Sequence, residues 1–542
     1  MNIFKMDVLP STLQFSTSYI SSSTTTSTIV ALCVFFALLC ACIIIGHLLE
    51  ETRWANESIT ALLLGFFSGL VVLLVTKFRS IDILMFSEDL FFLYLLPPII
   101  FNAGFQVKKK RFFRNFNYIL LFGVLGTVIS FGLISLGAFL LINRIGSVNL
   151  DIKDILALGV ILSATDSVCT LQVLSQDETP LLYSIVFGEG VVNDAMSIVL
   201  FNSVQSLNFS TITVTALELL GTFLYLFCTS TVLGIGVGLL SAYLIKTFYF
   251  GRHSTDREVA LMMLMAYFSY MIAELLELSA ILTIFFCGIV MSHYTWHNVT
   301  GNSRITTKHS FATISFISET FIFLYVGMDA LDIDKWRKSK ASIGTSIAVS
   351  STFIALVLIG RAALVFPIAN IANCFVTREN TRIEFRSQFV IWWAGLMRGA
   401  VTMALACNQF SISNSTSTED SAALMITSTI TLVLFSTLVF GSITKPLIEA
   451  VQLRHSKQSV SDSTDYHDEL RLLFLGSDAS ISETNNQPFQ RRSNLSLMMR
   501  YPATTVHYYW RQFDDKFMRT IFGGRDFVPV VPGTPPCENE IS

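Results

Sequence analysis

The sequence has few charged residues. Only 14% of its 542 residues are Asp, Glu, Lys or Arg, whereas soluble domains carry roughly 25%. The formal net charge of −3 gives no reason to expect nucleic acid as a partner. This shortage of charge argues against an ordinary soluble protein and favours a chain that folds in lipid.

Two kinds of ligand-binding motif are also missing. The nine cysteines are scattered and form no C-x-x-C pair, so neither a disulfide framework nor a zinc site is indicated. The phosphate-binding pattern G-x-x-x-x-G-K-[ST] is absent as well. We therefore expect no nucleotide and no other cofactor.

What the chain has instead is long apolar runs, because 52% of its residues are hydrophobic. A helix of about 20 apolar residues crosses the hydrocarbon core of a bilayer. The pattern predicts about thirteen such spans, near 28–47, 58–76, 84–103, 117–141, 153–174, 181–207, 217–246, 257–276, 279–294, 309–330, 343–374, 386–409 and 421–450. The predicted fold class is an all-α polytopic membrane protein, with membrane lipid as its solvent.

The segments before and after these spans differ from them in composition. Residues 1–27 form a Ser/Thr-rich leader without a basic start, which favours a retained first span over a cleaved signal peptide. Basic residues gather in the loops at 107–114, 246–257, 304–308 and 377–386. Positive loops face the cytosol, so thirteen crossings place the amino terminus in the lumen and the carboxyl terminus in the cytosol. The mixed loop "DALDIDKWRKSK" on the other face fits this assignment less well.

Residues 451–542 form a polar tail, which we interpret as cytosolic, regulatory and partly disordered. One part of it, near 505–523, has helical periodicity. Its apolar stripe consists of Val506, Trp510, Phe513, Phe517 and Ile521. The stripe is compatible with docking on the membrane domain (28–450), with a protein partner such as a calcium sensor, and with the lipid surface.

We single out five charged residues within predicted spans as intramembrane candidates: Asp166, Glu189, Asp194, Arg361 and Arg398. A charge within the bilayer is costly, and such residues usually mark an ion pathway. Buried ion pairs that only hold helices together are the alternative. Five such groups in four spans favour the pathway.

The stretch "VFGEGVVNDAMSIVLF" (186–201) holds two of these acids. On a helix Glu189 and Asn193 share a face, whereas Asp194 lies about 140° from Glu189 around the axis. Glu189 can therefore pair with one of the arginines. Asp194 then remains available to exchange a proton for a cation.

Two further segments interrupt helical patterns near these acids. Thr165–Asp166 lies among small residues and can unwind its span, which would expose oxygen ligands. Thr165, Asp166 and Asp194 are therefore candidate ligands for a transported cation. "WWAGLMRGAV" makes the span around Arg398 glycine-rich and broken. Pro97, Pro98 and Asn102 predict either a cavity wall or a packing kink.

These motifs together resemble a known family. "LLPPIIFNAGFQVKKKRFFRNF", "ATDSVCTLQVLSQDETPLLYSIVFGEGVVNDA", "ETFIFLYVGMDALDIDKW" and "WWAGLMRGAV" are similar to plant vacuolar sodium(potassium)/proton antiporters of the NHX type. The resemblance implies an NhaA-like fold, with two crossed interrupted helices in a core domain and a separate dimerisation domain. The broken helices would contain Thr165–Asp166 and the segment around Arg398.

The resemblance also implies a mechanism and a location. Asn193–Asp194 would mark electroneutral exchange of one Na⁺ or K⁺ for one proton, with Glu189 paired to Arg361 and Arg398 supporting the second broken helix. A homodimer in the vacuolar membrane is expected, with the endosomal membrane as the alternative. A cation channel and a non-transporting sensor with structural ion pairs remain competing hypotheses.

Overall fold

The computed structural model describes residues 11–49, 57–75, 88–145, 151–166, 168–174, 179–206, 212–248, 254–331, 343–375, 382–411, 419–452 and 513–523. These residues are almost entirely helical, and no strand occurs among them. Ten helices in this part of the chain are long and apolar enough to cross a membrane. A shorter apolar helical stretch, Phe91–Gln106, and two interrupted helices bring the helical units to thirteen. Each corresponds to one of the predicted spans.

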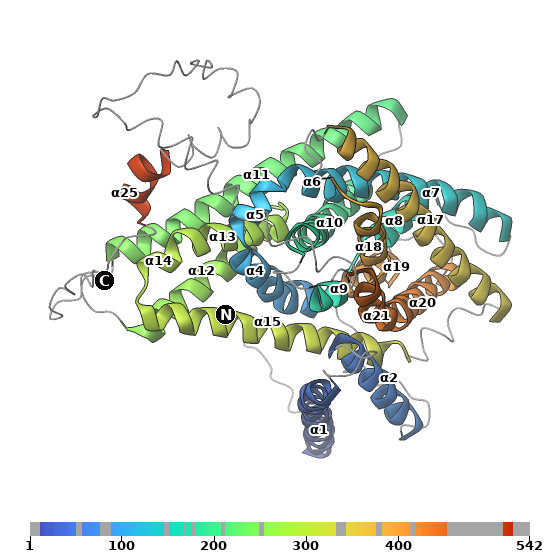
Figure 1. The fold of residues 1–542 in the computed structure, drawn as a ribbon. Helices are drawn as coiled ribbons and strands as arrows, with labels where there is room; N and C mark the ends of the chain where they lie inside the picture. The colour runs from blue at the N-terminus through green and yellow to red at the C-terminus, as the bar shows by residue number, and fades with distance from the viewer. Residues whose placement is uncertain are drawn as a thin grey trace, which may run out of the picture.

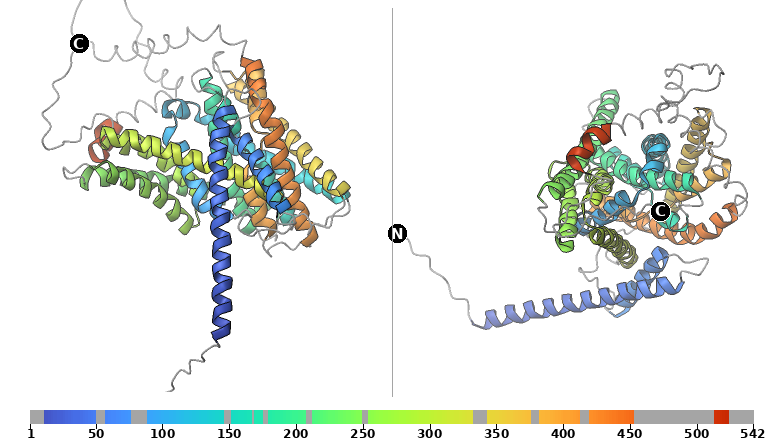
Figure 2. Two further views of the ribbon diagram at one scale, coloured as in Figure 1. Left: turned by 90° about the horizontal axis from the view of Figure 1, so that it is seen from below. Right: turned by 60° about the vertical axis from the view of Figure 1, so that its left-hand side comes forward.

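The helices before the first break are α1 (Ser11–Leu49), α2 (Glu57–Val75), α3 (Glu88–Leu90), η2 (Phe91–Leu95), α4 (Leu96–Gln106), α5 (Lys109–Arg114), α6 (Phe116–Leu120), η3 (Leu121–Leu125) and α7 (Gly126–Ile145). Segments labelled η are π-helical turns, which continue into the α-helices around them. Helix α1 begins inside the Ser/Thr-rich leader and contacts mainly α2 and α15 (Gly301–Asp329). Its amino-terminal half projects beyond the other helices (Figure 2).

The remaining helices are α8 (Ile152–Ser163), α9 (Val168–Val173), α10 (Pro180–Ser206), α11 (Ile212–Phe248), α12 (Thr255–Leu275), α13 (Ala280–His293), α14 (Thr295–Asn298), α15, α17 (Ile343–Phe375), α18 (Phe385–Ala394), α19 (Ala400–Ser411), α20 (Glu419–Phe435), η5 (Ser436–Phe440), α21 (Gly441–Gln452), η6 (Asp514–Met518) and α25 (Arg519–Phe522). The pairs α8–α9 and α18–α19 are the two interrupted helices. Their breaks cross, because the Asp166 N–H donates to the Met397 carbonyl at 3.0 Å.

The helices pack as two groups (Figure 1). One group contains α2, α4, α11, α12, α13 and α15, and the other contains α7, α8, α10, α17, α18, α19 and α20. Helix α5 follows α4 of the first group and leads through α6 and η3 to α7 of the second. The helices α10 and α19 of the second group contact α13 and α15 of the first, so the boundary runs between them.

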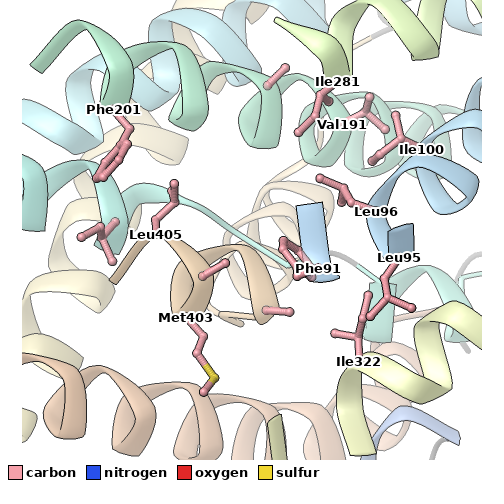
Figure 3. Packing of buried hydrophobic residues seen from close by; sticks show 14 of the residues in the cluster. Phe91, Leu95, Leu96, Ile100, Val191, Phe201, Ile281, Ile322, Met403 and Leu405 are labelled. Atoms are coloured by element: carbon pink, nitrogen blue, oxygen red, sulfur yellow. The ribbon is translucent and has the colours of Figure 1, made fainter. Parts of the chain in front are cut away.

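Apolar side chains fill much of this boundary (Figure 3). Val191 of α10 lies near Ile281 of α13 and Ile100 of α4, while Ile322 of α15 lies near Leu95. All five are buried. Contacts of this kind carry no directional hydrogen bonds, so the boundary has few bonds to break if one group moves against the other.

The two prolines after η2 explain why the helix loosens there. Pro97 and Pro98 have no N–H and cannot bond to carbonyls of the preceding turn. Two hydroxyl groups of α12 replace the missing donors: Tyr270 Oη donates to the Phe92 carbonyl at 2.8 Å and Tyr267 Oη to the Tyr94 carbonyl at 3.1 Å. The break is thus satisfied by a neighbouring helix, as membrane proteins require.

The tail contributes the segment Phe513–Gly523 to the described structure, and this segment contacts α11. Figure 1 shows α25 beside α11 and α14. The predicted stripe residues Val506 and Trp510 lie outside the described residues. Phe513 and Phe517 are 49% and 53% exposed, so the segment does not dock through its apolar stripe.

Candidate functional site

A cavity of about 370 Å³ lies between the two groups of helices. It reaches from Gln106 and Lys108, which are exposed, to Thr165, Asp166 and Asp194 at the crossing. The site therefore communicates with the surface on the side of the basic loop 107–114. The di-proline segment contributes to the wall through Leu96, Ile99, Ile100 and Asn102, as the cavity-wall interpretation of that segment predicted.

Asn193 joins three helices beside the cavity. Its Oδ1 accepts a hydrogen bond from the Thr165 N–H at 2.8 Å, and its Nδ2 donates to Thr127 Oγ1 at 2.9 Å and to the Ser163 carbonyl at 3.3 Å. The amide thereby binds both a donor and an acceptor that the break after α8 leaves without helical partners. Asn193 fixes the shape of that break while its neighbour Asp194 lines the cavity.

The two cavity aspartates act on each other. Asp166 lies close enough to Asp194 for their negative charges to repel. Two carboxylates sharing one site favour the uptake of a positive charge, either a proton or a metal cation. Carboxylate and backbone oxygens are ligands suited to hard cations. Asp194, Asp166 and Thr165 are therefore placed where a cation could bind.

Glu189 faces away from the cavity and pairs with Arg361. The distance between Arg361 Nη1 and Glu189 Oε1 is 2.5 Å, and Arg361 Nη2 also donates to the Ile391 carbonyl at 3.2 Å. Both side chains are buried. A Cβ atom at Gly395 would overlap the guanidinium group, which gives a physical reason for a glycine at that position. The pair connects α10, α17 and α18 without involving Asp194.

Arg398 binds carbonyls at both breaks. Its Nε donates to the Leu162 carbonyl at 3.0 Å, and its Nη1 donates to the carbonyls of Gly395 at 2.7 Å and Met397 at 3.0 Å. The side chain is completely buried. A guanidinium at the carboxyl ends of α8 and α18 neutralises the partial negative charge of those helix termini. Arg398 thus supports the crossing of both interrupted helices.

Two hydroxyl groups of η5 hold the main chain of Arg398. Its N–H donates to Ser436 Oγ at 3.1 Å, and Thr437 Oγ1 donates to its carbonyl at 3.1 Å. Sequence reasoning did not single out either residue. The next glycine is equally constrained, because a Cβ atom at Gly399 would overlap the Asp166 carboxylate. Glycine at this position permits the close approach of the two breaks.

A third cavity carboxylate was also missed. Glu319 of α15 lines the same cavity as Asp166 and Asp194, and its Oε1 accepts a hydrogen bond from Ser315 Oγ at 3.1 Å. It faces the two aspartates from the opposite group of helices. The criterion that identified the other acids, an ionisable group within a predicted span, also applies to Glu319.

Positive residues surround the outer end of the cavity. Lys108 and Arg111 line it, and the neighbouring Lys109 donates from Nζ to the Ser292 carbonyl at 2.9 Å. Burial lowers the pKa of Lys109 to about 8. A lysine whose pKa lies not far above neutral pH is therefore found next to the rim.

Comparison with known proteins agrees with this geometry. Residues 34–450 match the family model described as sodium/hydrogen exchanger, transmembrane. The chain is 60% identical to sodium/hydrogen exchanger 1 of Arabidopsis thaliana, covering 95% of this chain and 96% of that protein. It is 35% identical to human sodium/hydrogen exchanger 8, covering 78% of this chain and 72% of that protein.

A solved structure shares the fold. The sodium proton antiporter MjNhaP1 from Methanocaldococcus jannaschii, at pH 8, matches with a TM-score of 0.56 at 16% identity. The match covers 79% of this chain and 98% of MjNhaP1. It supports the predicted antiporter architecture. The chain is a multi-pass membrane protein that belongs to the sodium/hydrogen exchanger family.

Proposed function

We propose that this protein exchanges cytosolic Na⁺ or K⁺ for lumenal protons, with cation and proton competing for Asp194. The observation that carries the proposal is the placement of Asp194 and Asp166 together on one cavity, while Glu189 is neutralised by Arg361. One buried acid is thus committed to structure. The other two share a site that is most stable when a single positive charge occupies it.

The transport cycle follows from this arrangement. A deprotonated Asp194, with Asp166 and the Thr165 segment, binds a cation that enters past Lys108 and Gln106. The second group of helices then moves against the first across their apolar boundary. On the far side a proton displaces the cation, and the protonated carboxyl returns. Since one charge replaces another at the same carboxylate, each cycle is electroneutral.

The orientation and the compartment also belong to the proposal. The basic loop 107–114 borders the cavity, and positive loops face the cytosol. The open cavity is then cytosolic, as is the carboxyl-terminal tail. Strong similarity to plant exchangers supports a plant endomembrane, and we propose the vacuolar membrane. A homodimer and a regulatory protein at the tail remain part of this proposal.

Transport assays in proteoliposomes test the activity. Wild type and Asp194→Asn would be compared for proton release from acid-loaded vesicles after Na⁺ or K⁺ is added, with the membrane potential clamped. Exchange predicts that the wild type dissipates the proton gradient and the variant does not. The ratio of rates for the two ions then measures selectivity.

Asp151→Asn is the matched control, because Asp151 is exposed outside the cavity. It should transport like the wild type. A cation current that does not require a proton gradient would indicate a channel instead. A folded wild type that moves no protons with either ion would overturn exchange and favour the sensor hypothesis.

A further inference from the structure

The tail segment Asp514–Gly523 is held by a buried carboxylate. Asp514 is only 3% exposed. Its Oδ1 accepts a hydrogen bond from Tyr294 Oη at 2.5 Å, and its Oδ2 lies 3.6 Å from His293 Nε2. Arg519, from the same segment, donates from Nε to Oδ2 at 3.2 Å. Burying a carboxylate without partners would be costly. The partners of Asp514 therefore indicate a specific docking contact between the tail segment and the membrane domain.

The other end of the segment has its own receptor. Asn298 Nδ2 donates to the Phe522 carbonyl at 2.7 Å and to the Ala242 carbonyl of α11 at 3.2 Å. Gly523 has a φ of +77°, and a Cβ atom there would overlap the Asn298 side chain. The glycine is therefore required both by its backbone conformation and by its close contact. Helices α11, α13 and α14 together form the docking site.

This docking site also holds the connection between the two groups of helices. Ser292, directly before His293, accepts the hydrogen bond from Lys109 Nζ. Lys109 begins α5, the helix that links α4 to α6, and its neighbours Lys108 and Arg111 line the cavity. The tail and the interdomain connection thus bind adjacent residues at the end of α13.

We propose that residues 514–523 act as a latch in cis, which stabilises the cavity-open state by fixing the end of α13 to which α5 is anchored. This inference rests on the exchange activity proposed above. Movement of one group against the other must bend α5, and a contact that favours the unbent arrangement shifts the population toward it. Releasing the latch therefore lowers the fraction of molecules that offer the cavity to a cytosolic cation.

The test releases the latch from both ends. Asp514→Asn weakens one end and Gly523→Ala the other, and Tyr294→Phe combined with Asp514→Asn asks whether the two partners act through one contact. Asp256→Asn is the control, since it makes the same charge change at an exposed position of α12. Hydrogen–deuterium exchange of residues 514–523 reports docking. Cation flux from the tail side of sealed vesicles reports the apparent KM.

We expect faster hydrogen exchange in Asp514→Asn and Gly523→Ala, with a rise of about threefold to tenfold in apparent KM, as the net loss of about one ordinary hydrogen bond implies. The double variant should match Asp514→Asn, and Asp256→Asn should match wild type. Release of the segment with an unchanged KM would overturn the latch. An unreleased segment in both variants would overturn the docking contacts themselves. Failure of exchange would appear separately, as an inactive wild type.

Discussion

Replacing Arg361 by methionine tests the division of labour between the buried acids. Arg361 is 2% exposed and its partner Glu189 4% exposed, so the variant leaves a carboxylate buried without its counter-charge. Removing one partner of a buried ion pair costs about 3–5 kcal/mol of unfolding free energy. The Ile391 carbonyl also loses the hydrogen bond from Nη2. We expect a loss within that range, measured by reversible denaturant unfolding in micelles.

Two further variants make this prediction sharp. Adding Glu189→Gln to Arg361→Met removes the uncompensated charge and should recover about 1–3 kcal/mol of the loss. The folded double variant should still exchange cations because it retains Asp194. Arg386→Met is the control: this arginine is exposed on α18, and its loss should change stability by no more than about 0.5 kcal/mol. Equal stability of Arg361→Met and Arg386→Met, or additive losses in the double variant, would refute the reasoning.

Three other changes have defined outcomes. Gly399→Ala should reduce transport more than protein yield, because its methyl group would overlap Asp166; unaltered flux would contradict the close crossing of the breaks. Tyr270→Phe should lower the unfolding free energy by about 1–3 kcal/mol, because the Phe92 carbonyl loses its donor. Denaturant unfolding in micelles measures this, and an unchanged unfolding midpoint would show that the Tyr270 hydroxyl does not stand in for a missing proline N–H. Raising cytosolic pH through the Lys109 pKa of about 8 removes a positive charge next to the cavity rim and should lower the apparent KM for the cation. In Lys109→Arg the side chain stays charged, so the fall in KM around pH 8 should be lost. Identical KM–pH profiles for this variant and the wild type would contradict the prediction.

The overall fold was predictable because its determinants are local in the chain. Apolar runs define the helices, the small and polar residues at 164–167 mark the first break, and the glycine-rich stretch at 394–400 marks the second. The pairing of Glu189 with Arg361 was anticipated only through resemblance to a family, since either arginine satisfied the charge argument. In the structure Arg398 binds backbone carbonyls instead, a role that charge counting does not reveal.

Other parts of the site could not be predicted, for physical reasons. Ser436 and Thr437 resemble the many helical hydroxyls that bond only to their own backbone, such as Thr427 to the Ala423 carbonyl. No feature of the sequence around Ser436 and Thr437 indicates that their hydroxyl groups bond to the main chain of Arg398. In the tail, periodicity marked the stripe that includes Phe513 and Phe517 as a possible contact face, yet the Asp514 carboxylate and the Phe522 carbonyl make the hydrogen bonds to the membrane domain. Tertiary packing decides both cases.

The most direct test of competition at Asp194 is the apparent KM for the cation as a function of cytosolic pH. If cation and proton exclude each other from one carboxylate, acidification below the pKa of the site should raise KM by about tenfold per pH unit, as one-proton linkage requires. The maximal rate should stay constant in the same measurements. A KM that does not change with pH, while exchange continues, would contradict the account and show that proton and cation occupy different groups.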